Sequence, residues 1–295
     1  ICLDLVPTLE ASQTSGDQLF VPGRLFRVGP AKVVLGGCVA NTGVALKKLG
    51  ARVALNAKVG DDQLGSLLLI ELEHIDRSIV SGMVTAVGEA TSYSIVFSPV
   101  GVDRGFLHCP GVNDTFQASD LSWSHIEQTR LLHFGYPPLM RLTYLDGGAA
   151  LADQFRKAQT HGVLVSLDLA MPADEGSVTT VNWQNWLATV LPWVDIFAPS
   201  LDEILQMLQP ELAEQLRFTA NGDNIAQYIS LNQLDELTTE LLQLGPSIVL
   251  IKLGDRGLYL KTSQGISAEL KSRVRWQGQD WPAWAGVAIL EPCYD

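Results

Sequence analysis

Short apolar runs that read as strands alternate with helical patterns along most of the chain, and this alternation limits the fold more than any other feature. The runs are rich in Val, Ile and Leu, and between them apolar residues recur every three or four positions. Strands that are separated by helices usually pair in parallel. The sequence therefore predicts an α/β protein with a doubly wound, mostly parallel sheet flanked by helices. The predicted strands span residues 3–6, 51–59, 131–135, 163–169, 194–198, 247–253 and 258–262, and the predicted helices span residues 41–49, 64–75, 144–161, 183–191 and 234–244.

Two short two-stranded elements interrupt this alternation. The first is predicted within residues 24–35, as strands 24–28 and 31–35 on either side of a Gly-Pro turn. The second is predicted within residues 91–108. We expect the two elements to form a small β lid over one end of the larger sheet. Residues 209–230 are read as a polar stretch without a predicted element.

The net charge and the cysteine positions limit which classes of partner and which cellular compartment we expect. The chain has 295 residues and a net charge of -12, from 32 acidic and 20 basic side chains. Binding to nucleic acid or to an anionic membrane needs clustered Lys and Arg, so we expect neither partner. The four cysteines are too far apart in sequence for a zinc or redox motif, which indicates reduced thiols and a cytoplasmic location. The chain opens directly inside a strand-like run, and its N-terminus therefore looks trimmed.

Polar residues and glycines gather near the predicted strand ends. In open parallel sheets, ligands bind beyond the carboxyl ends of the strands. Asp4 either caps a turn or accepts hydrogen bonds from ligand hydroxyls, because a carboxylate within a buried strand needs a partner. The residues at or just past predicted strand ends are Asp4, Gly37, Asp168, Glu203 and Gly254, and they predict one ligand site.

A glycine pair before a helix carries the most specific pattern in the chain. Gly36 and Gly37 are followed by Asn41, then by Gly50 at the end of the predicted helix and by Gly60 before an acidic turn. This spacing resembles the N-terminal signature of the ribokinase-like (PfkB) carbohydrate kinases. The resemblance implies an ATP-dependent kinase that transfers the γ-phosphoryl group to a hydroxyl of a small sugar. It also implies a single ribokinase-like α/β domain over residues 1–295, and a homodimer through the lid.

The resemblance further implies which residues hold the sugar. In the family the glycine pair and the Asn line the sugar site, and an Asp in the first strand binds the sugar. In this chain, residues 101–113 resemble the lid segment of sugar kinases. The expected substrate-binding residues are therefore Asp4, Gly36, Gly37, Asn41, Arg104 and Asn113.

The nucleotide side is implied by two further matches. Residues 200–203 stand where the family usually has Asn-x-x-Glu, so Glu203 is expected to support Mg²⁺ indirectly, through water. Residues 252–257 resemble the family's strand and glycine turn beside ATP. The expected nucleotide-binding residues are Ser200, Lys252, Gly254, Asp255 and Gly257. Asp168 matches an acidic residue that the family has after the strand corresponding to residues 163–169 of this chain. The chain has no Walker-type phosphate loop, no Gly-x-Gly-x-x-Gly after the first strand and no nucleophile elbow.

The family's catalytic base is not found in these 295 residues. It lies in a Gly-Ala-Gly-Asp run, which does not occur here, so we expect a domain that lacks the C-terminal catalytic segment and a polypeptide that is inactive or nearly so. Three alternatives stay open. They are a nucleoside kinase of the same fold, a non-catalytic pseudo-kinase that binds a sugar or nucleotide, and a nicotinamide-dependent oxidoreductase.

Overall fold

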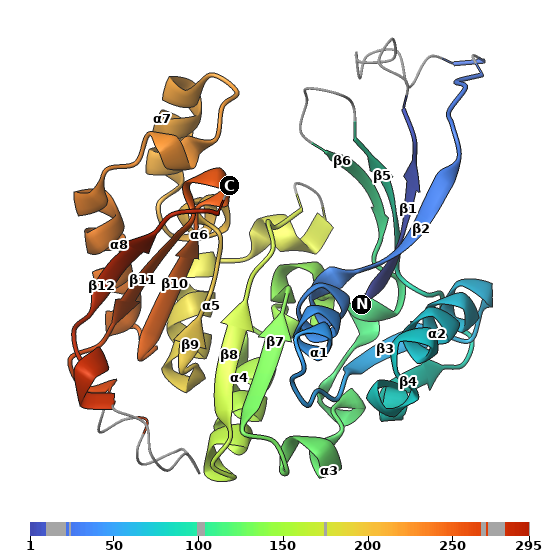
Figure 1. The fold of residues 1–295 in the computed structure, drawn as a ribbon, viewed down its shortest axis with the longest axis horizontal. Helices are drawn as coiled ribbons and strands as arrows, with labels where there is room; N and C mark the ends of the chain where they lie inside the picture. Colours follow the sequence, from blue (N-terminus) through green and yellow to red (C-terminus); the bar gives the residue numbers. More distant parts are fainter. Residues whose placement is uncertain are drawn as a thin grey trace. The chain divides into compact units, whose positions relative to one another are not determined.

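A computed structural model describes residues 1–9, 22–23, 25–98, 104–173, 176–266, 270 and 281–294. Its internal contacts divide the chain into two compact units, Ile1–Phe116 and Gln117–Asp295. Both units combine strands and helices (Figure 1), which confirms the predicted α/β class. The expectation of a single domain stays a prediction. No helix of the described residues is long and apolar enough to cross a membrane.

The first unit contains a four-stranded sheet of order β2-β1-β5-β6 and a separate parallel pair, β3 with β4 (Figure 1). In the larger sheet β1 is antiparallel to β2 and parallel to β5, and β5 is antiparallel to β6. The elements are β1 (Cys2–Pro7), β2 (Ala31–Gly36), β3 (Asn56–Gly60), β4 (Gly82–Ala86), β5 (Tyr93–Phe97), β6 (Gly105–Cys109), a π-helix (Val39–Val44), α1 (Ala45–Lys48) and α2 (Gln63–Ile75).

One side of β1 is anchored in an apolar core. Leu3 is fully buried and packs in a cluster with Val59 of β3 and with Leu68 and Leu72 of α2. Because side chains alternate along a strand, Asp4 lies on the opposite side of the sheet from Leu3. The apolar residues of α2 recur three or four positions apart, which is why this helix buries one side on the sheet.

The predicted hairpin of residues 24–35 is wrong in its pairing. Its second strand matches β2, but β2 pairs with β1, and residues 25–30 contain no strand. Thr8 donates its backbone N–H to the Pro30 carbonyl oxygen at 3.2 Å, and Gly29 donates to the Thr8 carbonyl oxygen at 2.8 Å. The Gly-Pro pair therefore continues the edge of the β1–β2 ladder instead of forming a turn. Residue 24 lies outside the described residues.

The second predicted two-stranded element is confirmed as the antiparallel pair β5 and β6, and its role as a lid stays a prediction. Residues 99–103 between the two strands lie outside the described residues. Several other boundaries shift, two of them by five residues at the start of an element. The strand predicted at 51–59 starts only at Asn56, and the helix predicted at 144–161 starts only at Ala149. Gly148 precedes that helix with a φ of +88°, a left-handed conformation that interrupts a right-handed helix.

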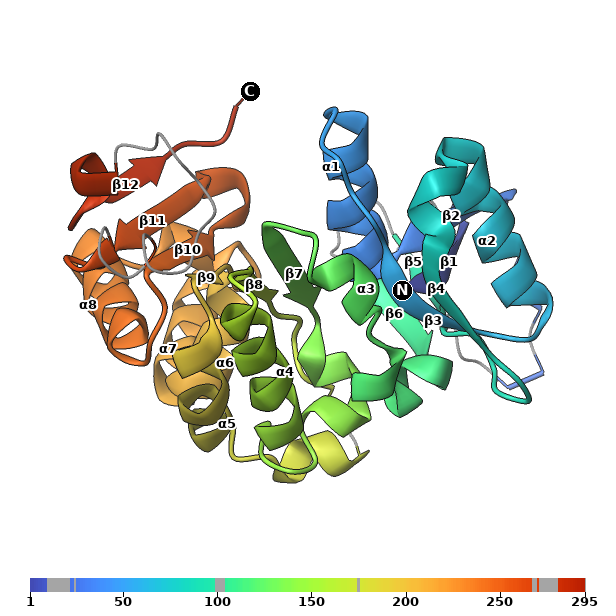
Figure 2. The ribbon, with the colours of Figure 1, turned by 90° about the horizontal axis from the view of Figure 1, so that it is seen from below.

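The second unit is built on a six-stranded sheet of order β12-β11-β10-β9-β8-β7. Strands β7 to β10 are parallel to one another, and β11 and β12 extend the sheet antiparallel. Figure 2 shows α4, α5 and α8 along one face of this sheet. The strands are β7 (Leu131–Gly135), β8 (Leu164–Asp168), β9 (Ile196–Phe197), β10 (Ile248–Lys252), β11 (Leu258–Thr262) and β12 (Ala288–Glu291), and the helices are α3 (Trp123–Ile126), α4 (Ala149–Thr160), α5 (Trp183–Val190), α6 (Leu201–Leu208), α7 (Pro210–Ala220) and α8 (Leu231–Gln243).

Residues 209–230, read as a polar stretch, contain α7, so the absence of a predicted element there is wrong. Pro210 starts this helix at a position that tolerates proline, and Asn221 ends it in a left-handed conformation. Ala213, Leu216 and Ala220 form its buried stripe. The stripe consists mostly of small residues, which explains why the sequence looked polar.

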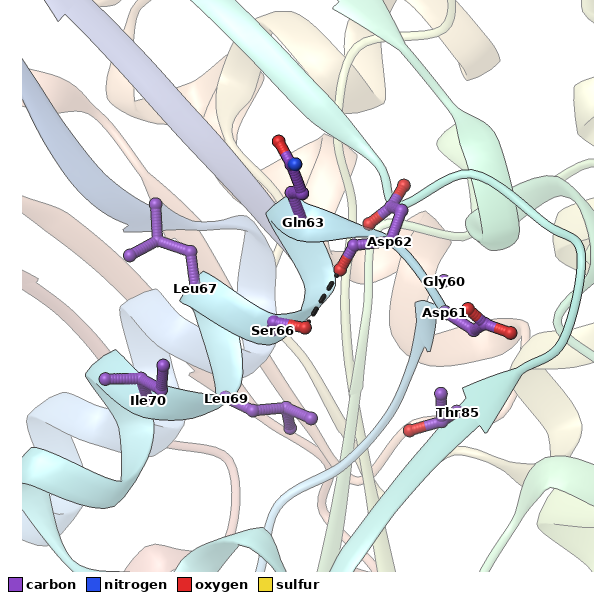
Figure 3. A pocket seen from close by; sticks show the side chains of 9 residues that line it. All are labelled: Gly60, Asp61, Asp62, Gln63, Ser66, Leu67, Leu69, Ile70 and Thr85. Atoms are coloured by element: carbon purple, nitrogen blue, oxygen red, sulfur yellow. Dashed lines mark hydrogen bonds between the residues drawn. The ribbon is translucent and has the colours of Figure 1, made fainter.

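Asp62 joins α2 of the first unit to the loop before β5. Its carboxylate caps α2 by accepting from the Gly65 N–H at 2.8 Å. It also accepts from the Thr91 N–H at 2.8 Å and from the Thr91 hydroxyl at 2.6 Å. Burial acts to raise the pKa of Asp62, but the hydrogen bonds from Thr91 and Gly65 outweigh it and leave the pKa lowered. Figure 3 shows this turn and the side chains around it. The turn borders an open depression of about 790 Å³, which none of the predicted site residues line.

Replacing Asp62 with alanine is expected to destabilise the protein by about 2–3 kcal/mol, because a helix cap and two further hydrogen bonds to a carboxylate are lost together. Since the pKa of Asp62 is lower in the folded state, its stabilising effect is full above the unfolded value and is lost as pH falls through the folded value. Urea unfolding at pH 7 and at pH 3 measures both effects. Asp61→Ala, which removes the exposed neighbouring carboxylate, is the matched control. Equal midpoints for the two variants at pH 7 would contradict this account.

Candidate functional site

Each unit holds a part of the predicted site, and the part in the first unit centres on Asp4. The structure places Asp4 in the middle of β1, so its predicted position at a strand end is wrong. The strand continues to Pro7 because β2 pairs with it along its whole length. Asp4 is half-buried, on the side of the sheet that faces away from the Leu3 core.

The glycine pair is explained by close packing around Asp4. A Cβ added to Gly36 would lie 2.2 Å from Asp4 Oδ2, so a larger residue would displace the carboxylate from its present position. Gly37 has a φ of +77°, and a Cβ there would lie 3.2 Å from Ile1 Cα. The structure therefore brings three predicted residues, Asp4, Gly36 and Gly37, into one place.

Cys2 is a partner of Asp4 that the sequence reasoning missed. Its Sγ donates to Asp4 Oδ1 at 3.2 Å. Burial, reinforced by the negative charge of Asp4, raises the pKa of the Cys2 thiol to about 12, so the thiol keeps its proton at neutral pH. The signal was available, because residues two apart in a strand share one face.

The remaining predicted sugar residues are less closely gathered. Asn113 donates from Nδ2 to the Ile1 carbonyl oxygen at 3.2 Å, which places it beside the contact of Gly37 with Ile1. Asn41 lies exposed inside the π-helix, so its expected position at the mouth of the helix is wrong. Arg104 is exposed before β6, with its guanidinium 5.9 Å from the centre of the Phe106 ring.

In the second unit the ends of three neighbouring parallel strands form a charged cluster. Lys252, at the end of β10, places Nζ 2.5 Å from Oδ1 of Asp168 at the end of β8. Between them, β9 leads to Ser200, which forms a β-bridge with Lys252. Asp168 therefore lies beside Lys252 and Ser200, two of the residues expected to bind the nucleotide.

Glu203 adds a half-buried carboxylate to this cluster. Its Oε2 accepts from the Ser200 N–H at 2.7 Å, and the Glu203 N–H donates to Ser200 Oγ at 3.4 Å, which makes a capping box at the start of α6. Burial raises the pKa of Glu203, while the positive charge of Lys252 opposes the shift. A carboxylate held near a lysine and a second carboxylate is a suitable donor set for a hydrated Mg²⁺.

The predicted glycine turn follows β10 as a short 3₁₀-helix, Gly254–Arg256. Asn224 donates from Nδ2 to the Leu253 carbonyl oxygen at 3.1 Å and to the Asp255 carboxylate, and Gln227 donates to Asp255 at 3.2 Å. These hydrogen bonds lower the pKa of Asp255, that of Asn224 most strongly. Asp255 therefore positions the turn. The sequence reasoning missed Asn224 because residues 209–230 were read as a polar stretch.

A Cβ on Gly257 would lie 2.1 Å from the Glu291 carbonyl oxygen, and Gly257 has a φ of +102°. Glycine at this position is thus required by the packing of β12 against the turn, whatever the turn binds. The contact explains Gly257 structurally, and its role in nucleotide binding stays a prediction.

The sequence is similar to those of known carbohydrate kinases. The model of the pfkB family of carbohydrate kinases matches residues 12–271. An uncharacterized sugar kinase of Archaeoglobus fulgidus is 25% identical over 218 residues, which cover 74% of this chain and 73% of that protein. The 2-dehydro-3-deoxygluconokinase of Bacillus subtilis is 26% identical over 248 residues, covering 81% of this chain and 67% of that protein.

A solved structure shows the same fold. The ribokinase of Arabidopsis thaliana, complexed with ribose and ATP, aligns with a TM-score of 0.63 and 16% identity. The alignment covers 99% of this chain and 75% of that chain. At this level of identity the likeness establishes the fold.

Proposed function

Because this chain belongs to the pfkB family of carbohydrate kinases, we propose that it binds ATP with Mg²⁺ and a small sugar, as an ATP-dependent sugar kinase does. The observation that carries the proposal is the position of Asp4 against Gly36. A carboxylate that accepts hydrogen bonds from sugar hydroxyls must remain accessible, and the absent Cβ provides the room it occupies. Arg104, Asn41 and Asn113 are proposed as further substrate contacts.

The second unit would bind the nucleotide. Lys252 is proposed to contact the phosphates of ATP, because it is a cation at the carboxyl ends of parallel strands, where ligands of such sheets bind. Ser200, Gly254, Asp255 and Gly257 are proposed to line the same region. Glu203, with Asp168 nearby, would hold Mg²⁺ through water, and the ion would neutralise charge on the phosphates.

Exchanging Gly36 for alanine is expected to weaken sugar binding about tenfold or more, because the new Cβ displaces the Asp4 carboxylate while leaving its charge in place. Gly105→Ala is the matched control, since Gly105 also lies in this sheet and a Cβ there meets no atom within 4 Å. Titration calorimetry with the sugar that the unmodified protein binds best compares the two variants. Equal affinities would show that the Asp4–Gly36 contact has no part in sugar binding.

Changing Glu203 to glutamine is expected to reduce affinity for Mg²⁺-ATP several-fold while leaving ATP binding without Mg²⁺ nearly unchanged. The pKa of Glu203 is raised in the folded state, so ionisation of this residue reduces stability as pH rises above the unfolded value. The glutamine variant should therefore gain thermal stability relative to the unmodified protein between pH 4 and pH 7. Glu211→Gln, an exposed first-turn acid of α7, is the control and should change neither quantity. Unchanged Mg²⁺-ATP affinity in the Glu203 variant would remove this residue from the metal site.

Turnover is a separate part of the proposal. The Gly-Ala-Gly-Asp run that carries the family's catalytic base does not occur in these 295 residues. We therefore propose that this polypeptide binds its ligands and transfers phosphate only slowly. There are two competing functions, a non-catalytic sensor of a sugar or nucleotide and a nucleoside kinase. A binding competition between adenosine and free sugars tests for the nucleoside kinase, which should prefer adenosine.

Assembly and location complete the proposal. Farther along the strands, the side of the sheet that carries Leu3 also carries the apolar row Val33, Leu5, Ile95 and Leu107, and both Val33 and Leu107 are exposed. This row supports a homodimer through the lid, which light scattering on the purified protein tests. We propose a cytoplasmic location, without nucleic acid or a membrane as a partner, from the acidic charge and the dispersed cysteines.

A further inference from the structure

We propose that His108 determines which sugars the site accepts, by contacting a hydroxyl at the opposite end of the substrate from Asp4. The proposal rests on the proposed sugar site at Asp4. It adds His108 of β6 to that site. The substrate must then carry two hydroxyls far enough apart for one to contact Asp4 in β1 and the other to contact His108 in β6.

The pairing of three strands aligns these side chains. Asp4 of β1 pairs with Ser94 of β5, and Ser94 pairs with His108 of β6. Residues that pair directly point to the same side of a sheet, so the three side chains form one polar row (β1, β5 and β6 in Figure 1). The neighbouring row of Leu3, Tyr93 and Cys109 points to the other side, where Leu3 packs in the core.

The spacing of the row suits a small sugar. Neighbouring strands lie about 4.8 Å apart, so the backbones at Asp4 and His108 are separated by about 10 Å. The two side chains lie on the same side of the sheet, at the two ends of the row. A molecule of five or six carbons with hydroxyls at both ends can therefore contact the carboxylate and the imidazole together.

Ser94 fixes the orientation of the imidazole. Its side chain is buried, and its Oγ lies 3.0 Å from His108 Nδ1, whereas the His108 residue as a whole is exposed. The bond to Nδ1 leaves Nε2 as the ring nitrogen directed away from Ser94. A fixed ring with an exposed edge can select a ligand hydroxyl by position as well as by chemistry.

The protonation state matches a neutral sugar. Although the residue as a whole is exposed, partial burial of the ring lowers the pKa of His108, and the charge of the N-terminal ammonium adds to this shift. The charges of Asp4 and Asp114 and a hydrogen bond to the Tyr93 backbone act in the opposite direction, but the pKa remains lowered, so the ring is neutral at pH 7. A neutral imidazole has one donating and one accepting nitrogen, and a hydroxyl can satisfy either one. Asp4 only accepts hydrogen bonds when ionised. Asp4 therefore binds a hydroxyl only as an acceptor, whereas His108 can bind one as either a donor or an acceptor.

The test is titration calorimetry of the 295-residue protein with D-ribose, D-fructose and 2-dehydro-3-deoxygluconate. The sugar that binds best is then compared with its monodeoxy analogues. His108→Phe is expected to weaken binding of that sugar about three- to tenfold, the range of one neutral hydrogen bond. It should also abolish the preference for the sugar over one particular deoxy analogue. His108→Gln, which keeps a hydrogen-bonding group, should retain most of the affinity and the preference.

His125→Phe is the matched control, because His125 makes the same kind of bond, Nδ1 to Ser122 Oγ at 2.9 Å, in the second unit. It should leave sugar binding unchanged. If the unmodified protein binds a sugar and His108→Phe binds the sugar and all its analogues as before, the inference about His108 is overturned. A uniform loss without a change in preference also overturns it, because it indicates a structural role only. If the unmodified protein binds none of the three sugars, the proposed sugar site itself fails.

Discussion

Asp4→Ala should lower the affinity of the protein for its sugar by at least about 100-fold. A hydrogen bond to a charged group contributes about 1.5–3 kcal/mol, and a carboxylate can accept from two hydroxyls of one sugar. The loss of two such bonds corresponds to about 10²–10⁴ in the dissociation constant. Titration calorimetry measures it directly.

Asp4→Asn separates the charge of this residue from its shape. The amide keeps one acceptor oxygen and fits the space beside Gly36, so a smaller loss of about tenfold is expected. The variant also removes the negative charge that helps to raise the pKa of the Cys2 thiol, so alkylation of Cys2 should become faster at a given pH. Thermal unfolding of both variants shows whether they remain folded. Sugar affinity that is unchanged in a folded Asp4→Ala protein would remove Asp4 from the site.

We also expect phosphoryl transfer by the 295-residue polypeptide to be slow. A positioned general base contributes about 10²–10⁴ to the rate, and the Gly-Ala-Gly-Asp run that supplies it in the family does not occur here. With saturating sugar and Mg²⁺-ATP, sugar-dependent ADP formation should be slower by about that factor than in a family member that carries the run. A coupled assay for ADP makes this comparison.

Two outcomes separate the possibilities for turnover. Sugar-dependent ADP formation at about 1–100 s⁻¹, the usual range for kinases, would mean that another residue of this chain acts as the base. Slow turnover together with tight binding of sugar and ATP would support the proposed division between binding and catalysis.

Strands rich in apolar residues were the most predictable parts of the fold. β7 and β11 have the predicted boundaries, and β8 and β10 lie within their predicted ranges. For β7, β8 and β10 the reason is that buried parallel strands carry apolar residues on both sides. The meeting of Asp168 and Lys252 could also be predicted, because both follow such strands in the same sheet. For these strands, the apolar pattern of the sequence and the position in the sheet lead to the same prediction.

Features that depend on pairing between distant segments could not be predicted in this way. The Gly-Pro pair at residues 29–30 looks locally like a turn, but its hydrogen bonds to Thr8 make it part of the β1–β2 ladder. In the same way, His108 joins Asp4 only through the register of β1, β5 and β6, which a single sequence does not specify. The polar row therefore emerges from the structure, whereas the glycine pair was visible in the sequence.

The most direct test of the central claim, that the Asp4 face of the first unit binds a sugar, is calorimetric titration of the unmodified protein. D-ribose, D-fructose and 2-dehydro-3-deoxygluconate are titrated in separate experiments, with Asp4→Ala measured in parallel. We expect saturable binding of one sugar per chain for at least one of the three, and an affinity at least about 100-fold lower for Asp4→Ala. Absence of binding to all three sugars, or equal binding by the two proteins, would contradict the claim.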